Sequence, residues 1–171
     1  MSSEKAIFKI GGTILENPIY FKNTFTQLYR LLQENHIKVI IVIPGGGSYA
    51  NFVREIDKQL NIGDTLAHWI AIYAMNYNGY FIKQQYPSIT LTENINELKI
   101  ADRRISLFLP FNYLKKYDTL PHSWDVTSDS ITLYIAHKLE LRECFLIKDV
   151  DGIIDQNGEV MQNLTSSLYL Q

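Results

Sequence analysis

The sequence is short of cysteine, of basic charge and of long apolar runs, and each shortage excludes a class of protein. Its single cysteine, Cys144, lies in an apolar stretch, so the chain forms neither an internal disulfide nor a cysteine-based metal site. Sixteen basic against eighteen acidic side chains give a formal net charge of −2, which argues against nucleic acid and anionic membranes as partners. The fully apolar run over residues 39–43, like every other such run in the sequence, falls far short of the ~18 residues of a membrane-spanning helix. The N-terminal residues also lack the apolar core of a secretion signal, so we expect a cytoplasmic protein.

The composition that remains is that of an ordinary globular protein. Hydrophobic residues make up 46% of the 171 residues, which is enough to close one hydrophobic core. Two full domains would need a longer chain. We therefore expect a single domain over residues 1–171.

Short apolar runs alternate along the chain with longer segments of helical periodicity. This alternation is typical of crossover units around a parallel sheet, so we expect an α/β three-layer sandwich with a largely parallel central sheet. The run over 38–43 is apolar almost throughout and predicts a strand covered on both faces. The other predicted strands cover 6–10, 105–109 and 143–147, with shorter ones near 89–91 and 98–100. The predicted helices cover 22–35, 48–60, 64–85 and 126–139, with Ser48 and Asp64 placed to cap two of them and a polar loop over 110–121.

Two glycine clusters each follow a predicted strand. Gly11 and Gly12 end the first strand, whereas Gly45, Gly46 and Gly47 end the second and open a helix. Glycine lets backbone amides approach a phosphate closely, and a helix N-terminus adds partial positive charge. Lys9 can add a point charge to the same phosphates. Either cluster alone is also explained as a tight turn, but the two clusters together with Lys9 favour a phosphate site.

A dense run of hydrogen-bonding side chains over 121–130 precedes a predicted helix. Helix capping explains two or three of them, but it does not explain His122, Trp124 and Asp129 as well. A carboxylate in the first helical turn can orient a lysine ammonium beside a phosphoryl group, and Asp129 is our candidate for this. A second acidic turn, Lys148 to Gly152, is by itself typical of structure rather than function. Histidine and cysteine show no metal-ligand spacing, so we predict no metal held by protein side chains.

Four motifs, in their order and spacing, resemble those of the amino acid kinase superfamily, which includes acetylglutamate, uridylate, aspartate and carbamate kinases. They are Lys9-Ile10-Gly11-Gly12, Pro44-Gly45-Gly46-Gly47, Thr127-Ser128-Asp129-Ser130 and Asp149-Val150-Asp151-Gly152. The finer patterns over 63–72 and 120–130 are similar to one branch, the aminomethylfuranmethyl phosphate kinases of methanofuran biosynthesis. The resemblance implies the amino acid kinase fold. It also implies a phosphotransferase that uses ATP and Mg²⁺ to convert a small phosphorylated acceptor, [5-(aminomethyl)furan-3-yl]methyl phosphate, to its diphosphate.

The resemblance further implies a role for each candidate residue. Lys9 would stabilise the transferred phosphoryl group and Asp129 would organise the lysines, which makes these two the catalytic candidates. The glycine amides and the acidic turn would bind phosphates and border the nucleotide, through Gly11, Gly12, Gly45, Gly46, Gly47, Lys148, Asp149, Asp151 and Gly152. An aromatic-rich pocket suits a furan ring and a basic group suits its phosphate. The acceptor candidates are therefore Arg54, His68, His122, Trp124, Asp125 and Ser128.

Two expectations concern the completeness and assembly of this fold. Members of the superfamily continue for further strands after the acidic turn, whereas this sequence ends at Gln171, so we expect a reduced nucleotide half. A non-catalytic phosphate-binding or partner subunit with the same fold therefore stands as the alternative to a kinase. The predicted helix over 64–85 carries a broad apolar stripe from Leu66 to Tyr80, which predicts a homodimer that buries it, with a central core helix as the alternative.

Overall fold

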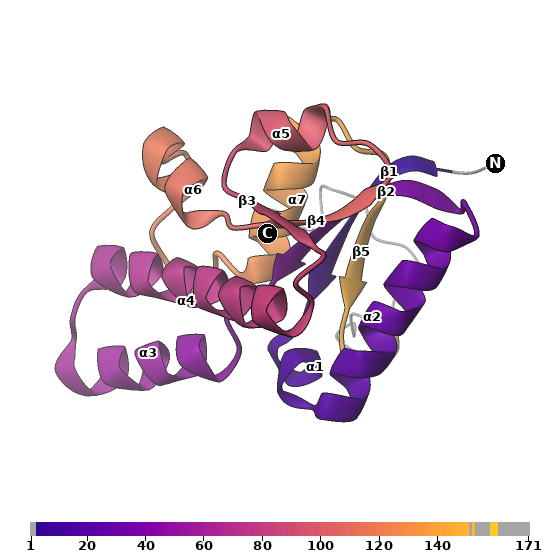
Figure 1. Cartoon of the computed structure of the whole chain (residues 1–171). Helices are drawn as coiled ribbons and strands as arrows, with labels where there is room; N and C mark the ends of the chain where they lie inside the picture. The colour runs from indigo at the N-terminus through magenta and orange to yellow at the C-terminus, as the bar shows by residue number, and fades with distance from the viewer. Residues whose placement is uncertain (1–2, 151, 153–157, 161–171) are drawn as a thin grey trace.

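A sheet of five parallel strands forms the centre of the computed structural model, which describes residues 3–150, 152 and 158–160 (Figure 1). The strands are β1 (Ser3–Ile10), β2 (Ile37–Pro44), β3 (Thr90–Thr92), β4 (Arg104–Phe108) and β5 (Cys144–Ile147). Their order across the sheet is β3-β4-β2-β1-β5, and every pair of neighbours is parallel. The prediction of a largely parallel α/β fold is confirmed. The carboxyl ends of β1, β2 and β5 therefore lie on the same side of the sheet, which we call its carboxyl edge.

The long apolar run in the sequence becomes the interior strand β2. It lies between β4 and β1, and every residue from Val39 to Pro44 is buried. Successive side chains of a strand point to opposite faces, so Ile40 and Val42 belong to one core while Ile41 and Ile43 belong to the other. The sheet is thus covered on both faces, as the run predicts.

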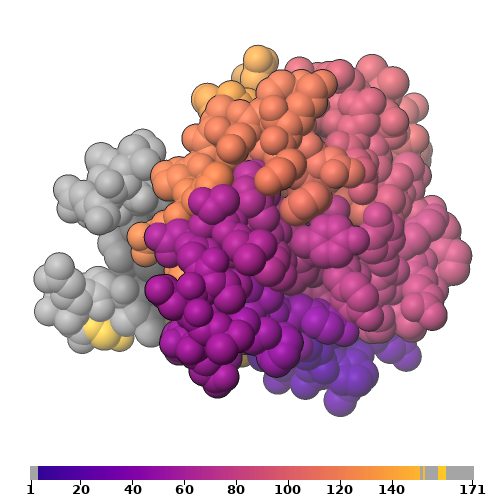
Figure 2. Space-filling view, turned by 90° about the vertical axis from the view of Figure 1, so that its left-hand side faces the viewer, coloured from indigo at the N-terminus to yellow at the C-terminus, as the bar shows by residue number. Residues whose placement is uncertain are grey.

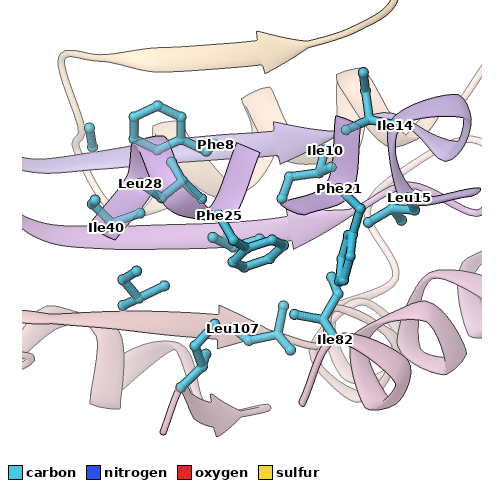
Figure 3. Packing of buried hydrophobic residues seen from close by; sticks show 14 of the residues in the cluster. Phe8, Ile10, Ile14, Leu15, Phe21, Phe25, Leu28, Ile40, Ile82 and Leu107 are labelled. Carbon is cyan, nitrogen blue, oxygen red and sulfur yellow. The ribbon is translucent and has the colours of Figure 1, made fainter. Parts of the chain in front are cut away.

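One face is covered mainly by α1 (Gly12–Glu16) and α2 (Pro18–Gln33). Asn17 ends the first helix and begins the second, because its side-chain oxygen accepts hydrogen bonds from the N–H groups of Ile19 and Tyr20. The apolar stripe of α2 then places Phe21, Phe25 and Leu28 against the sheet, where Figure 3 shows them beside the strand residues Phe8, Ile10, Ile40 and Leu107.

The other face is covered by α7 (Ser128–Lys138), α5 (Ile95–Lys99), α6 (Phe111–Tyr117) and part of α4 (Asp64–Gln85). The remaining helix, α3 (Gly47–Leu60), packs on α4 and α1, and with α4 it forms a helical hairpin beside the sheet (Figure 1). Among the described residues, no helix combines the length and apolarity needed to cross a membrane.

Several local predictions are wrong. Residues 98–100 form no strand, because Leu98 is buried from the short helix α5, and the predicted polar loop over 110–121 contains the helix α6. Ser48 and Asp64 cap no helix, since glycines occupy both N-cap positions. The apolar run over 143–147, which reads as a buried strand, forms β5, and β5 is only half-buried because, among the described residues, it pairs on one side only, with β1. Helix α1 follows Gly11 directly and has too few residues to show a helical period.

Helix α4 is buried on one side and exposed on the other, which bears on both interpretations of its apolar stripe. Trp69, Ile72 and Met75 join the core beneath it. The outward residues Leu66, Ile70, Tyr73, Tyr77 and Tyr80 are exposed. The helix is therefore a core helix on one side, and on the other it leaves an apolar surface.

Replacing Gly79 with alanine should test how closely α4 approaches the sheet. A Cβ at Gly79 would lie 2.2 Å from Cδ2 of the buried Leu109, so Gly79→Ala should lower the free energy of unfolding by about 1–3 kcal/mol despite alanine's higher helix propensity. Urea unfolding followed by circular dichroism measures the change. In the double variant Gly79→Ala/Leu109→Ala, the clash is gone, so the loss should be smaller than the sum of the single losses. Additive losses would contradict the close approach.

Candidate active site

Three charged side chains from three different elements meet at the carboxyl edge of the sheet. Lys9 lies near the end of β1, Asp129 lies in the first turn of α7, and Lys148 follows β5. The Lys9 ammonium nitrogen is 2.9 Å from Oδ1 of Asp129, and the Lys148 ammonium nitrogen is 2.5 Å from Oδ2. Lys9 is only 6% exposed. One carboxylate therefore bridges two ammonium groups, which leaves the cluster with an excess of positive charge.

The lysines keep Asp129 ionised. Burial alone would raise the pKa of Asp129, but the hydrogen bonds and charges of Lys148 and Lys9 outweigh burial and hold this pKa below its usual value. Its position in the first turn of α7 adds to this, because a helix N-terminus favours negative charge. The Thr127 and Ser130 side chains form a capping box that fixes the same turn.

Burial also determines the state of Cys144 beside this cluster. Burial first, and then the charge of Asp129, raise the pKa of Cys144 to about 11. The thiol therefore stays protonated near neutral pH and is no nucleophile.

The two glycine loops are in direct contact. A Cβ at Gly12 would lie 2.3 Å from the Cα of Gly47, and Gly47 itself takes a positive φ of +57°. The Gly45 N–H donates to the carbonyl of Ile10 at 2.8 Å, and the Gly11 N–H donates to the carbonyl of Ile147 at 2.9 Å. The expectation that Gly11 and Gly45 offer their amides to phosphate is thus wrong for this structure, since both amides tie neighbouring strand ends together.

Two further side chains hold the second glycine loop. The buried Asn78 of α4 donates from Nδ2 to the carbonyl of Gly45 at 2.7 Å. The Glu16 carboxylate, at the end of α1, accepts a hydrogen bond from the N–H of Ser48 at 2.5 Å. Glu16 therefore supplies the carboxylate at the start of α3, where Ser48 was expected to act as the cap. Nothing in the local sequence marks either residue, because both contacts span more than thirty positions.

A cavity of about 250 Å³ opens beside these loops. It is bordered by α1, the start of α3, the buried side of α4 and the segment that leads into α7, and it brings together Gly12, Gly46, Gly47, Arg54, His68, Trp124 and Ser128 from the predicted site. His122 and Asp125 are not among the described residues that line it, so their expected contact with an acceptor stays a prediction. The sequence interpretation missed other polar residues on the wall, namely Thr13, Glu16, Asn51, Ser123 and Thr127.

His122 packs against His68, a residue of the cavity wall. Its Nε2 lies 2.7 Å from a carboxylate oxygen of Asp118, its Nδ1 lies 3.1 Å from the hydroxyl of Thr65, and its ring stacks on His68 at 4.7 Å between centroids. Burial, followed by the nearby His122, lowers the pKa of His68, and Asp118 opposes this shift only in part. The cavity therefore presents a neutral imidazole from His68.

The last predicted turn is described only in part. Lys148 and Asp149 are exposed after β5, and Gly152 is exposed as well, whereas Asp151 lies outside the described residues. The described residues hold no group of three or more histidine, cysteine, aspartate or glutamate side chains that could bind a metal ion.

The lowered pKa of His68 should make stability fall in mild acid. Below about pH 6.5 the unfolded chain binds more protons at this histidine than the folded chain does, so the free energy of unfolding decreases as the pH falls. His68→Gln removes this contribution and should flatten the decrease between pH 7 and pH 5 in urea unfolding experiments. His137→Gln, at an exposed position on α7, is the control for removing a histidine from the surface. Equal slopes for the wild type and His68→Gln would contradict the proposed neutral state.

Comparison with known proteins places this site in a family. The family model described as "Amino acid kinase family" matches residues 4–166. The chain is 40% identical over 152 residues to [5-(aminomethyl)furan-3-yl]methyl phosphate kinase of Methanocaldococcus jannaschii, a match that covers 88% of this chain and 68% of that protein.

Solved structures agree at the level of the fold. The uridylate kinase from Archaeoglobus fulgidus has a TM-score of 0.63 at 18% identity, covering 92% of this chain and 69% of that one. The UMP kinase from Bacillus anthracis has a TM-score of 0.69 at 15% identity, covering 90% of this chain and 68% of that one. The prediction made from the order of four motifs is confirmed: the chain belongs to the amino acid kinase family, a family of phosphotransferases.

Proposed function

We propose that the chain transfers the terminal phosphoryl group of ATP to the phosphate of [5-(aminomethyl)furan-3-yl]methyl phosphate, giving the diphosphate in methanofuran biosynthesis. The observation that carries the proposal is the position of the Lys9–Asp129–Lys148 cluster at the same sheet edge as the glycine loops that border the cavity. The name of the relative from Methanocaldococcus jannaschii supports this acceptor. We place the reaction in the cytoplasm, where ATP is available.

The charges at the sheet edge suit a nucleotide donor. Two ammonium groups against one carboxylate leave a positive charge to balance the phosphates of ATP. Both carboxylate oxygens of Asp129 already face lysines, so a magnesium ion would be held mainly by the phosphates themselves. When bound, Mg²⁺ would shield the charge of the donor phosphates.

The reaction needs no general base from the protein. An oxygen of the acceptor phosphate forms the new bond to the terminal phosphorus of ATP, and the bond from that phosphorus to the bridging oxygen of ADP breaks. A phosphate monoester has its second pKa near 6, so the attacking oxygen is already ionised at neutral pH. Asp129, paired with two lysines, is a poor base but holds both ammonium groups in place. Lys9 and Lys148 would then stabilise the charge that develops during transfer.

The cavity offers matching groups for the acceptor. Arg54 supplies a permanent cation, and Trp124 with His68 supplies ring surfaces for a furan. The neutral imidazole of His68 avoids a second positive charge beside the aminomethyl group of the acceptor. Ser128, at the start of α7, lies on the wall next to Asp129 and so joins the acceptor cavity to the charged cluster.

Replacing Lys9 with methionine should remove turnover while leaving the acceptor bound. We expect kcat to fall by about two to three orders of magnitude, because a buried charge near the transferred group is lost, while Asp129 keeps Lys148 as a partner. A coupled assay for ADP release measures kcat. Calorimetry with the acceptor should show a Kd within about threefold of the wild type. Lys38→Met, at a lysine of β2 that lies outside the cluster, is the matched control.

Two outcomes would contradict the kinase assignment. Unchanged turnover in the Lys9→Met variant would remove Lys9 from the reaction. Binding of the acceptor by the wild type without any ATP-dependent turnover would favour the alternative of a binding or partner subunit.

We also propose a homodimer formed through α4. The exposed residues Leu66, Ile70, Tyr73, Tyr77 and Tyr80 recur at intervals of four and three, which is the spacing of a helix–helix seam. A second copy of the same helix, related by a twofold axis, would bury them.

Charged substitutions on α4 should dissociate this dimer. Ile70→Glu/Tyr77→Glu places carboxylates in the apolar seam, so light scattering during size-exclusion chromatography should shift from the dimer mass to the monomer mass. Ile100→Glu is the control, because Ile100 is 82% exposed and lies outside α4. A monomeric wild type at high concentration, or a dimer that survives the double substitution, would refute the interface.

A further inference from the structure

We propose that Asp57 is a positioning residue that sets the geometry of the acceptor cavity through Trp124, an assignment that rests on the proposed function. Trp124 donates a hydrogen bond from Nε1 to Oδ2 of Asp57 at 2.8 Å. Trp124 lines the cavity, whereas Asp57 is not among the described residues that line it. Asp57 therefore acts on the acceptor through another side chain.

The same hydrogen bond also fixes the position of the cavity's cation. The Arg54 guanidinium carbon lies 4.7 Å from the centroid of the Trp124 ring, so Arg54 packs on the indole in a cation–π contact. An indole whose N–H is bonded to a carboxylate on a neighbouring helix cannot rotate freely about its side-chain torsions. Asp57 thus orients the Trp124 ring, and the ring in turn restricts the position of the Arg54 guanidinium.

The Asp57–Trp124 bond joins helix α3 to the irregular segment that precedes α7. Helix α3 packs on α4 and α1 beside the sheet, and residues 118–127 form an irregular segment before α7. Figure 2 shows α3 (purple to magenta) and the segment in orange side by side on one face of the molecule. On its other side, the segment is held through His122 by Thr65 of α4. The Asp57–Trp124 bond completes the attachment by fastening it to α3.

Removing the bond should therefore affect acceptor binding selectively. The charged cluster stands on β1, α7 and the end of β5, and none of these elements contains Asp57 or Trp124. Loss of the bond leaves this cluster in place while the indole and Arg54 lose their fixed positions. The KM for the acceptor should rise, and kcat and the KM for ATP should change little.

Kinetics of two Asp57 variants test this expectation with [5-(aminomethyl)furan-3-yl]methyl phosphate as acceptor. Asp57→Leu keeps a branched side chain but removes the hydrogen-bond acceptor, so the acceptor KM should rise about tenfold with kcat within about twofold. Asp57→Asn keeps an oxygen that accepts from the indole and should restore the acceptor KM to within about threefold. Glu55→Leu is the matched control on the same helix, because Glu55 is exposed and pairs with Lys58. Equal losses in kcat, in both KM values and in melting temperature would indicate a merely structural role.

A double-mutant cycle shows whether Asp57 acts through Trp124. Trp124→Phe lacks the indole N–H, so adding Asp57→Leu to it should change the acceptor KM by less than about twofold. A further tenfold increase in the double variant would overturn the assignment.

Calorimetric titration of the acceptor separates this assignment from the proposed function. If the wild type does not bind the acceptor, the proposed function fails and the assignment fails with it. If the wild type binds and Asp57→Leu binds equally well, only the assignment fails. A Kd about tenfold higher for Asp57→Leu than for the wild type supports it even where no turnover is seen.

Discussion

A buried carboxylate held between two ammonium groups is the interaction on which the site depends. Burying a charge without partners is costly, so Asp129 and Lys9 are stable at the sheet edge only because they pair with each other and with Lys148. That pairing needs the ends of β1 and β5 and the start of α7 to lie at one place, which a parallel sheet with a crossover helix provides. The resulting excess of positive charge is what an incoming phosphate would neutralise.

The glycine loops show how packing within the chain uses residues that a phosphate-binding motif would also use. Gly12 and Gly47 lack side chains because the two loops touch, and the amides of Gly11 and Gly45 bond to strand carbonyls. The tight-turn interpretation therefore accounts for the amides of Gly11 and Gly45, while phosphate binding by the other glycines stays a prediction. Fewer glycines border the cavity than the two motifs contain. Those on its wall are Gly12, Gly46 and Gly47.

The cavity proposed for the acceptor depends on side-chain contacts rather than on the sheet. His122, which the sequence suggested as an acceptor ligand, stacks on His68 and lies within hydrogen-bond distance of Asp118 and Thr65. The charged cluster, by contrast, is attached to two strands and a helix that the core fixes firmly. This division suits an enzyme family that keeps one phosphoryl-transfer centre and varies its acceptors, because cavity walls can change without disturbing the sheet.

The sequence by itself determined the parallel α/β architecture, the order of the motifs and the choice of Lys9 and Asp129, because apolar periodicity and residue type act over short distances along the chain. It did not reveal α1, α5 and α6, because helices of so few residues show no clear period. It also did not reveal that β5 is half-buried as the outermost strand of the sheet. Only the tertiary structure decided that Glu16 and Asn78 hold the second glycine loop and that Trp124 bonds to Asp57. Each of these contacts joins residues more than thirty positions apart, so it depends on how whole elements pack and leaves no pattern in the local sequence.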